Sequence, residues 1–205
     1  QKDGKIGMLF PIIAYYAADR LFAPRKLVKR RRLDTEPFSA YQDTLAPGSR
    51  FKEFQEWFGR YNQEETREEM DQLVGVSHPY VSPHRPTGRL DPVRATMVAA
   101  LQDHGCKAFS FDSIQGEMRV LTGDPELWLS VRDMSDGFRA IIGLVGDLAH
   151  RCVRLNPLAG DDVVAETPGI VLIDEVDMHL HPAWQQTVIG SLQAAFPRIQ
   201  FIVTT

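Results

Sequence analysis

Three short apolar runs in this chain predict buried β-strands. They lie at residues 6–17, 169–173 and 199–204 and are rich in branched, aliphatic and aromatic side chains. Continuous runs of this kind are typical of parallel strands that are covered on both faces. A helix is expected at 182–196, so the last two strands and this helix form a βαβ unit with a right-handed crossover. The pattern therefore predicts an α/β fold.

Helical periodicity fills much of the chain between the first and second of these runs. Residues 49–71 predict a helix with an apolar stripe, formed by Phe51, Phe54, Phe58 and Tyr61. We expect this stripe to pack against the protein core rather than to stack on bases. A second helix is expected at about 91–103, with Asp91 as its cap and Pro92 at its first position.

The last hundred residues predict a further set of elements. Alternating patterns indicate strands at 107–111, 117–121 and 127–131, and a hairpin turn at 122–125 joins the last two. A helix is expected at about 136–152 and an exposed loop at 156–168. We divide the chain into a core strand (1–20), a helical insertion (21–104) and a C-terminal lobe (105–205).

Composition narrows the class of protein. The chain has 205 residues, of which 43% are hydrophobic and 24% charged, as is ordinary for a globular protein. Its net charge of −4 argues against a globally basic nucleic-acid binder. Its two cysteines predict a reducing, cytoplasmic location without a disulfide framework. No apolar run approaches the roughly 18 residues of a membrane span.

Two adjacent carboxylates follow the second apolar run directly. Asp174 and Glu175 come after Gly169–Ile173, and strands of open α/β sheets present ligand-binding groups at this end. This is the pattern of a Walker B motif, in which Asp174 would hold Mg²⁺, directly or through water. Glu175 would orient or deprotonate an attacking water. The alternative is a core strand that merely ends in a polar loop.

The residues after this pair strengthen the nucleotide hypothesis. The segment Leu-Ile-Asp-Glu-Val-Asp-Met-His-Leu-His-Pro (172–182) resembles the Walker B and D-loop region of ABC-type ATPases of the RecF, SMC and OLD-like group. It is most similar to the prokaryotic AAA-annotated branch of anti-phage systems, including Septu and retron-associated ATPases. The resemblance implies that this loop reaches a dimer partner, and it assigns Asp177, His179 and His181 to the nucleotide site.

A second motif lies at the start of the helix expected at 136–152. Ser135 is a plausible N-cap, Gly137 permits close backbone approach, and a helix N-terminus suits a phosphate. The segment resembles the ABC signature Leu-Ser-Gly-Gly, although Met134 replaces its leucine and Asp136 its first glycine. The resemblance implies that Ser135 and Gly137 contact the γ-phosphate held by the opposite subunit. An ordinary capped, buried helix would use the same residues.

The sequence contains no Gly-x-x-x-x-Gly-Lys-Ser/Thr phosphate loop. The resemblance therefore implies a P-loop NTPase-like (ABC-type) sheet flanked by helices, whose N-terminal Walker A lobe is missing from this chain. It also places a switch histidine at position 206, directly after the last strand.

The leading hypothesis is an ABC-type ATPase that binds ATP and Mg²⁺ between two heads paired head-to-tail. The resemblance implies a homodimer or higher homo-oligomer that controls an effector, such as a nuclease, in phage defence or DNA metabolism. One alternative is a scaffold or regulatory module that does not hydrolyse nucleotide. Another is nucleic-acid binding through Arg25–Arg32, where six of eight residues are cations. Arg20 would meet phosphate or pair with a surface acid.

Overall fold

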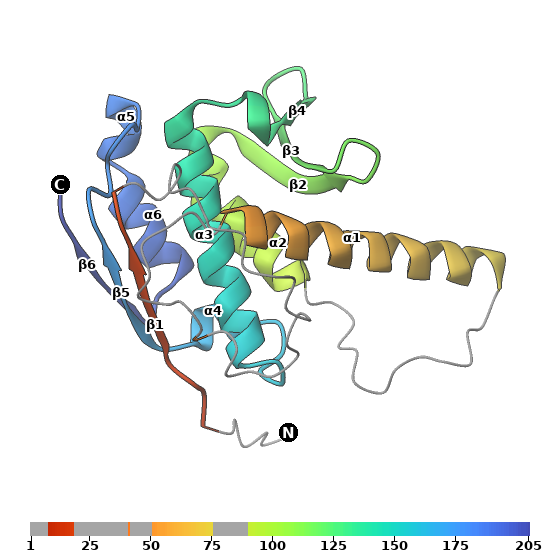
Figure 1. The fold of residues 1–205 in the computed structure, drawn as a ribbon, viewed down its shortest axis with the longest axis horizontal. Coiled ribbons are helices and arrows are strands. Elements are labelled where there is room, and N and C mark those ends of the chain that lie inside the picture. Colours follow the sequence, from red (N-terminus) through yellow and green to blue (C-terminus); the bar gives the residue numbers. More distant parts are fainter. Residues whose placement is uncertain (1–7, 19–40, 42–50, 76–89) are drawn as a thin grey trace, which may run out of the picture.

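The computed structural model describes residues 8–18, 41, 51–75 and 90–205. Arg20 and the basic segment Arg25–Arg32 lie outside these residues. The first sheet contains three parallel strands in the order β1-β5-β6, which are β1 (Ile12–Tyr16), β5 (Gly169–Ile173) and β6 (Ile199–Val203) (Figure 1). The predicted α/β fold with a parallel sheet is confirmed, and β5, which precedes Asp174, is the central strand.

A second sheet is antiparallel and stands apart from the first. It consists of β2 (Cys106–Asp112), β3 (Glu117–Thr122) and β4 (Leu127–Ser130), close to the three predicted strands. Asp112 stabilises the turn after β2, because its Oδ1 accepts hydrogen bonds from the N–H groups of Ile114 and Gln115. These bonds favour the ionised carboxylate and lower the pKa of Asp112.

The helices differ widely in length. They are α1 (Phe51–Val74), α2 (Leu90–Leu101), α3 (Asp136–Leu155), α4 (Val163–Glu166), α5 (Pro182–Gln185) and α6 (Val188–Ala195), with 3-10 turns at Gln102–His104 and Val131–Asp133. None of the helices in the described ranges is long and apolar enough to cross a membrane.

Helix α3 is the centre of the core, and nearly all of its residues are buried. Gly143 and Gly146 lie on the side of α3 that faces α1. A Cβ at Gly143 would lie 3.1 Å from the Phe51 ring, and one at Gly146 would lie 2.3 Å from the Phe54 ring. The absence of side chains at these positions lets the aromatic stripe of α1 pack closely on α3. The predicted core role of this stripe is confirmed for Phe54 and Phe58, which are fully buried.

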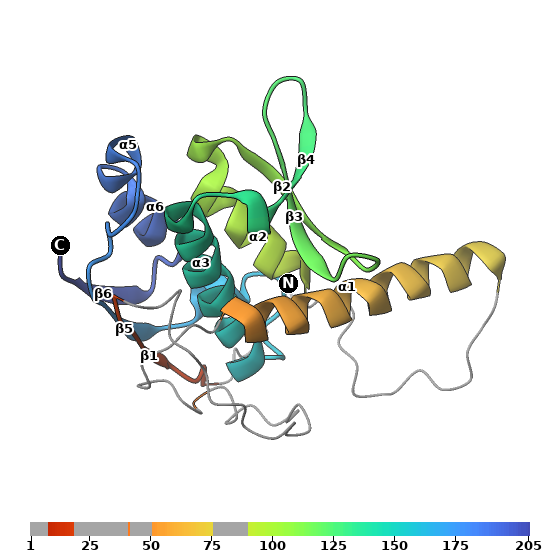
Figure 2. The ribbon, with the colours of Figure 1, turned by 45° about the horizontal axis from the view of Figure 1, so that its top comes forward.

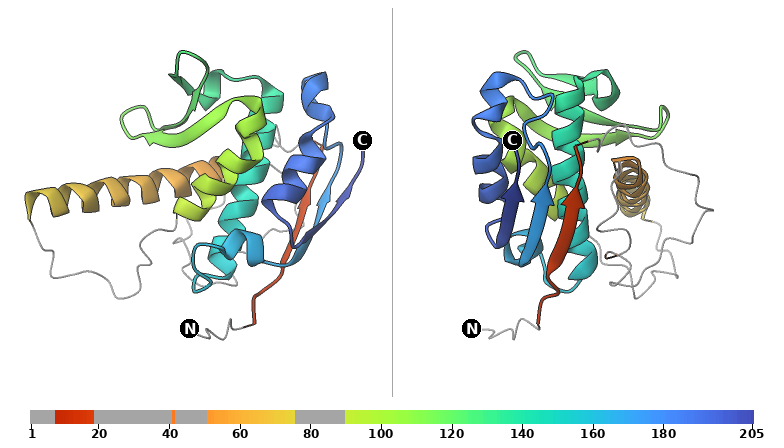
Figure 3. Two further views of the ribbon diagram at one scale, coloured as in Figure 1. Left: turned by 180° about the vertical axis from the view of Figure 1, so that it is seen from behind. Right: turned by 60° about the vertical axis from the view of Figure 1, so that its left-hand side comes forward.

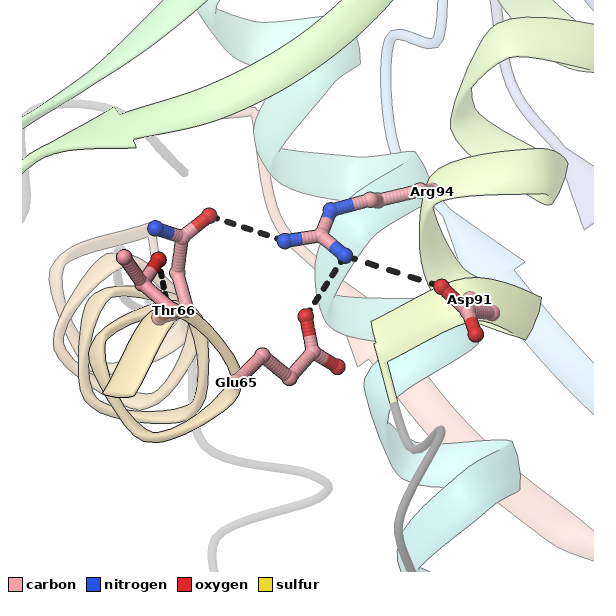
Figure 4. A network of polar contacts seen from close by, with 5 residues as sticks. Glu65, Thr66, Asp91 and Arg94 are labelled. Atoms are coloured by element: carbon pink, nitrogen blue, oxygen red, sulfur yellow. Dashed lines mark hydrogen bonds and ion pairs between the residues drawn. The ribbon is translucent and has the colours of Figure 1, made fainter. Parts of the chain in front are cut away.

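Helix α1 extends well beyond the body of the molecule (Figures 1 and 2). Arg94 of α2 holds it in place, because its guanidinium contacts Glu65 Oε2 at 2.7 Å and Asn62 Oδ1 at 2.8 Å. Figure 4 shows that the same guanidinium reaches back to Asp91 on its own helix, at 3.6 Å. These contacts fix the direction in which α1 leaves the core.

The described helices cover only one face of the parallel sheet (Figure 3). Ile12, Val171 and Ile173 point into the core and are at most 1% exposed. On the opposite face, the exposed side chains of Ile13, Ile170, Leu172 and Ile202 range from 37% to 50% in exposure. Apolar residues on both faces of a parallel sheet are typical of a strand layer that is buried between two helical layers.

Two local predictions were wrong. The helix expected at 182–196 is divided into α5 and α6, and Thr187 lies at the break. Its hydroxyl bonds to the carbonyl of Trp184 at 3.3 Å, and such side-chain bonds compete with a regular helix. The loop expected at 156–168 contains the short helix α4, because Val163 and Val164 are buried in the core.

Candidate active site at the carboxyl edge of the parallel sheet

The predicted Walker B pair lies where the central strand leaves the sheet. Ile173 pairs with Tyr16 on one side and with Val203 on the other, so all three strands end at the same level. The N–H of Asp174 donates to the carbonyl of Tyr16 at 2.8 Å, which extends the β1-β5 pairing by one residue. The Asp174 side chain is partly buried, and Glu175 is exposed. Both carboxylates therefore lie at the carboxyl ends of the parallel strands, as the strand prediction expected. Open α/β folds bind ligands at this end of the sheet.

Thr204 holds the segment that carries both acids. Its hydroxyl donates to Asp174 Oδ1 at 2.5 Å and accepts the N–H of Glu175 at 2.9 Å. Sequence analysis missed this residue. A signal was present, because Thr204 is the first polar residue after β6, just as Asp174 is the first after β5.

The loop that follows, residues 174–181, contains two residues with left-handed backbone. Glu175 has φ +46° and His179 has φ +64°. Positive φ values are uncommon for residues other than glycine, and such strained conformations occur most often at functional sites. Two turns shape the loop, with the Met178 N–H bonded to the Glu175 carbonyl and the Leu180 N–H to the Asp177 carbonyl. Val176 and Leu180 are buried and anchor the loop in the core.

The loop residues assigned to the nucleotide site have different surroundings. The carbonyl of Asp177 accepts a hydrogen bond from Gln185, and the Asp177 side chain is partly buried. His181 caps α5, because its Nδ1 accepts the N–H of Ala183 at 3.3 Å. His179 and His181 are both exposed, and His179 has a left-handed backbone. Their roles toward a nucleotide remain predictions.

Ser135 is the N-cap of α3, as its position predicted. Its Oγ accepts the N–H of Phe138 at 3.3 Å, and its side chain is exposed. A serine hydroxyl that accepts one hydrogen bond still has its own proton to donate. Ser135 can therefore cap the helix and bind an anionic oxygen at the same time, next to the positive end of the helix dipole.

Gly137 is pressed against the 174–181 loop of its own chain. A Cβ at this position would lie 2.1 Å from the His179 carbonyl oxygen and 3.1 Å from the Leu180 Cα. Only glycine fits there, because any side chain would displace the loop main chain. Both predicted motifs therefore meet within one subunit at this contact, which sequence analysis did not anticipate.

Trp184 adds a second link between these motifs. Its ring packs on Phe138 of α3, with centroids 5.0 Å apart, and on His104, with centroids 4.4 Å apart. Burial disfavours the charged imidazolium and lowers the pKa of His104, while neighbouring Asp103 opposes that shift. A neutral ring at this position suits aromatic packing against Trp184.

A buried polar network connects α3 to the sheet edge. Asp147 Oδ2 accepts hydrogen bonds from the Tyr16 hydroxyl and from Arg151 Nε, both at 2.8 Å. The Asp147 and Arg151 side chains are only 5% and 7% exposed. Tyr16 thus holds the Asp174 N–H with its carbonyl and the centre of α3 with its side chain. Sequence analysis missed this network because Tyr16 and Asp147 lie 131 residues apart in the sequence.

The oxygen-rich sheet edge suits a magnesium ion. Mg²⁺ prefers one or two carboxylates together with water and phosphate oxygens. Asp174 offers such a carboxylate on a rigid strand end, and Thr204 fixes the orientation of one of its oxygens. Bound Mg²⁺ would neutralise charge on the phosphates of a nucleotide.

Comparison with known proteins supports the nucleotide hypothesis. The sequence profile of a protein family described as "AAA domain, putative AbiEii toxin, Type IV TA system" matches residues 16–205. The chain belongs to this AAA-domain family. The match begins at Tyr16, the last residue of β1, and includes β5, β6, the antiparallel sheet, α3 and the 174–181 loop. A mixed α/β fold with a parallel sheet is consistent with a P-loop NTPase.

Several curated proteins resemble parts of this AAA-domain chain. The Retron Vc95 probable ATPase of Vibrio cholerae serotype O1 biovar El Tor is 45% identical over 89 residues, which are 43% of this chain and 16% of that protein. The Retron Ec83 probable ATPase of Escherichia coli is 49% identical over 77 residues, 38% of this chain and 14% of that protein.

The Septu protein PtuA of Bacillus mycoides (strain KBAB4) is 42% identical over 86 residues, 42% of this chain and 11% of that protein. The predicted resemblance to anti-phage defence ATPases of the Septu and retron-associated type is confirmed. The matched residues span less than a fifth of each of these three proteins.

Proposed function

We propose that this chain is the catalytic lobe of an ATPase that hydrolyses ATP with Mg²⁺. The observation that supports it best is the position of Asp174 and Glu175 at the carboxyl edge of the central parallel strand. Membership of the AAA-domain family and the two relatives named probable ATPases support the same activity.

In this mechanism each residue of the loop has a separate task. Asp174 would bind the metal that neutralises the phosphates, and exposed Glu175 would orient the attacking water or accept its proton. The N–H groups at the start of α3, with Ser135, would bind a phosphate through the helix dipole. Asp177, His179 and His181 would complete the nucleotide site across a subunit interface.

The phosphate loop would come from another part of the full-length protein. The apolar face formed by Ile13, Ile170, Leu172 and Ile202 supports this proposal, because a parallel sheet normally has helices on both faces. We propose that the Walker A lobe covers this face and places its lysine at the edge that carries Asp174.

Two such heads would form a head-to-tail homodimer or a higher homo-oligomer. The names of the relatives place them in retron and Septu systems, which supports a role in phage defence through an effector such as a nuclease. The two-cysteine composition favours the cytoplasm. The helical insertion at 21–104 and a nucleic-acid contact at Arg25–Arg32 remain predictions.

The decisive experiment compares ATP hydrolysis by the full-length protein and by its Glu175→Gln variant. The amide keeps the shape of the side chain but cannot accept the proton, so turnover should fall at least about a hundredfold while ATP binding persists. Size-exclusion chromatography with ATP and Mg²⁺ should show a larger species that Glu175→Gln traps.

Glu126→Gln is the matched control, because Glu126 forms an exposed ion pair with Lys107 beside the second sheet, away from Asp174 and Glu175. It should hydrolyse ATP at the parental rate. If the parent shows neither turnover nor nucleotide-dependent assembly, alone or with cellular partners, the scaffold hypothesis replaces the ATPase. Parental turnover by Glu175→Gln would instead remove the catalytic role from Glu175.

A further inference from the structure

We propose that Thr204 is a positioning residue that sets the geometry of Asp174 and Glu175. The inference rests on the proposed ATPase function for its consequence, but its structural basis is independent of nucleotide. It concerns a residue that neither the Walker B pattern nor the signature pattern includes.

All polar groups of Thr204 bond to the four residues 173–176. Its N–H donates to the Ile173 carbonyl, and its own carbonyl accepts the Val176 N–H, both at 3.0 Å. Its hydroxyl donates to Asp174 Oδ1 and accepts the Glu175 N–H. The backbone bonds extend the β5-β6 ladder past its last strand pair, whereas the hydroxyl bonds require threonine or serine at this position.

The hydroxyl acts on both acids through different atoms. Its proton fixes one carboxylate oxygen of Asp174, and this sets the direction of the second oxygen. Its lone pair holds the Glu175 N–H, where the backbone has the unfavourable φ of +46°. An oriented N–H at Glu175 stabilises this left-handed conformation, which in turn determines where the exposed Glu175 carboxylate points.

The bond to a carboxylate is charge-assisted and therefore stronger than a bond between neutral groups. Thr204 thus couples the two acids, because rotation of its side chain about χ1 would move Oγ away from both Asp174 Oδ1 and the Glu175 N–H. Small displacements of catalytic groups, of the order of 1 Å, can lower a rate about a hundredfold.

Amide hydrogen exchange in the full-length protein without nucleotide tests the structural part. Thr204→Val keeps the β-branched shape and removes the hydroxyl, so exchange at Glu175 should accelerate at least about fivefold. Val176 is an internal control, because its N–H bonds to the Thr204 backbone and should keep its protection. Thr204→Ser should restore slow exchange at Glu175. Unchanged exchange at Glu175, or equal acceleration at both amides, would overturn the proposal.

ATP hydrolysis tests whether the positioning by Thr204 affects catalysis. Thr204→Val should lower kcat about ten- to a hundredfold with a smaller effect on KM, and Thr204→Ser should recover most of it. Thr122→Val, the same change at the end of β3 in the other sheet, should leave kcat unchanged. Parental kcat in Thr204→Val overturns the positioning role. Absence of turnover in the parent refutes the proposed function instead, and the exchange result still decides whether Thr204 orders the loop.

Discussion

At the scale of single residues, the site depends on backbone conformations and close contacts that few side chains permit. Glu175 and His179 have left-handed backbones, and Gly137 lies directly under the His179 carbonyl. Strained conformations of this kind persist only where surrounding contacts impose them. Here the contacts come from Thr204, from the buried anchors Val176 and Leu180, and from the glycine in the first turn of α3.

Gly137→Ala should destabilise the protein by about 1–3 kcal/mol, because its methyl group would overlap the His179 carbonyl oxygen. Urea unfolding monitored by tryptophan fluorescence measures this effect. Gly190→Ala is the matched control, because among the described residues no atom outside α6 lies within 4 Å of a Cβ there. Gly190 lies in the first turn of α6, and alanine there should stabilise the helix by up to about 0.5–1 kcal/mol. Equal stability of Gly137→Ala and the parent would contradict the close contact.

At the scale of elements, α3 connects the parts of the site. Its first turn contacts the 174–181 loop through Gly137, and its middle contacts β1 through the bond between Asp147 and Tyr16. Tyr16 in turn holds the Asp174 N–H. A shift of α3 would therefore displace both ends of the 174–181 loop, because each end is connected to the helix through a different contact.

Asp147→Asn should destabilise the protein by up to about 3–5 kcal/mol, because it removes the buried carboxylate that Arg151 Nε contacts. Tyr16→Phe removes only the neutral donor and should cost about 1 kcal/mol. Chemical denaturation of both variants compares the contribution of the ion pair with that of the hydrogen bond from Tyr16. Equal losses of stability would show that the ion pair contributes no more than the hydrogen bond from Tyr16.

At the scale of the whole molecule, the parallel sheet has one buried face and one exposed apolar face. Helix α1 and the antiparallel sheet lie on the covered side, where α1 packs on α3 and the antiparallel sheet packs on α1 and α2 (Figures 1 and 3). The strands of the parallel sheet are apolar on both faces, as a central layer requires. The proposed Walker A lobe would cover the exposed face and bury the sheet between two layers.

In the full-length protein, Leu172→Cys should therefore be protected from a thiol reagent. Ile114→Cys, at a site 98% exposed in the turn after β2, should react rapidly and serves as control. Background labelling should be slow, because burial raises the pKa of Cys106 and Cys152 to about 12, so that little thiolate forms near neutral pH. Peptide mass spectrometry measures each site. Equal labelling of both introduced cysteines would show that this face is uncovered.

The sequence by itself determined most of the local elements and the position of two acids at the end of β5. The apolar runs predict the parallel strands, the aromatic spacing predicts the buried face of α1, and Ser135 predicts the start of α3. These features follow from periodicity and capping, which act over a few residues. The Asp174–Glu175 pair was recognisable because it directly follows a buried strand, at the end where open α/β sheets bind ligands.

Tertiary structure alone decided how these parts meet. The bonds of Thr204 to Asp174 and Glu175 span about thirty residues, and the contact of Gly137 with His179 joins two separate motifs. Helix α4 is present where two neighbouring valines are buried in the core. Hydrogen-bond partners and close contacts between distant residues leave no periodic trace in a sequence, because they depend on how the layers pack.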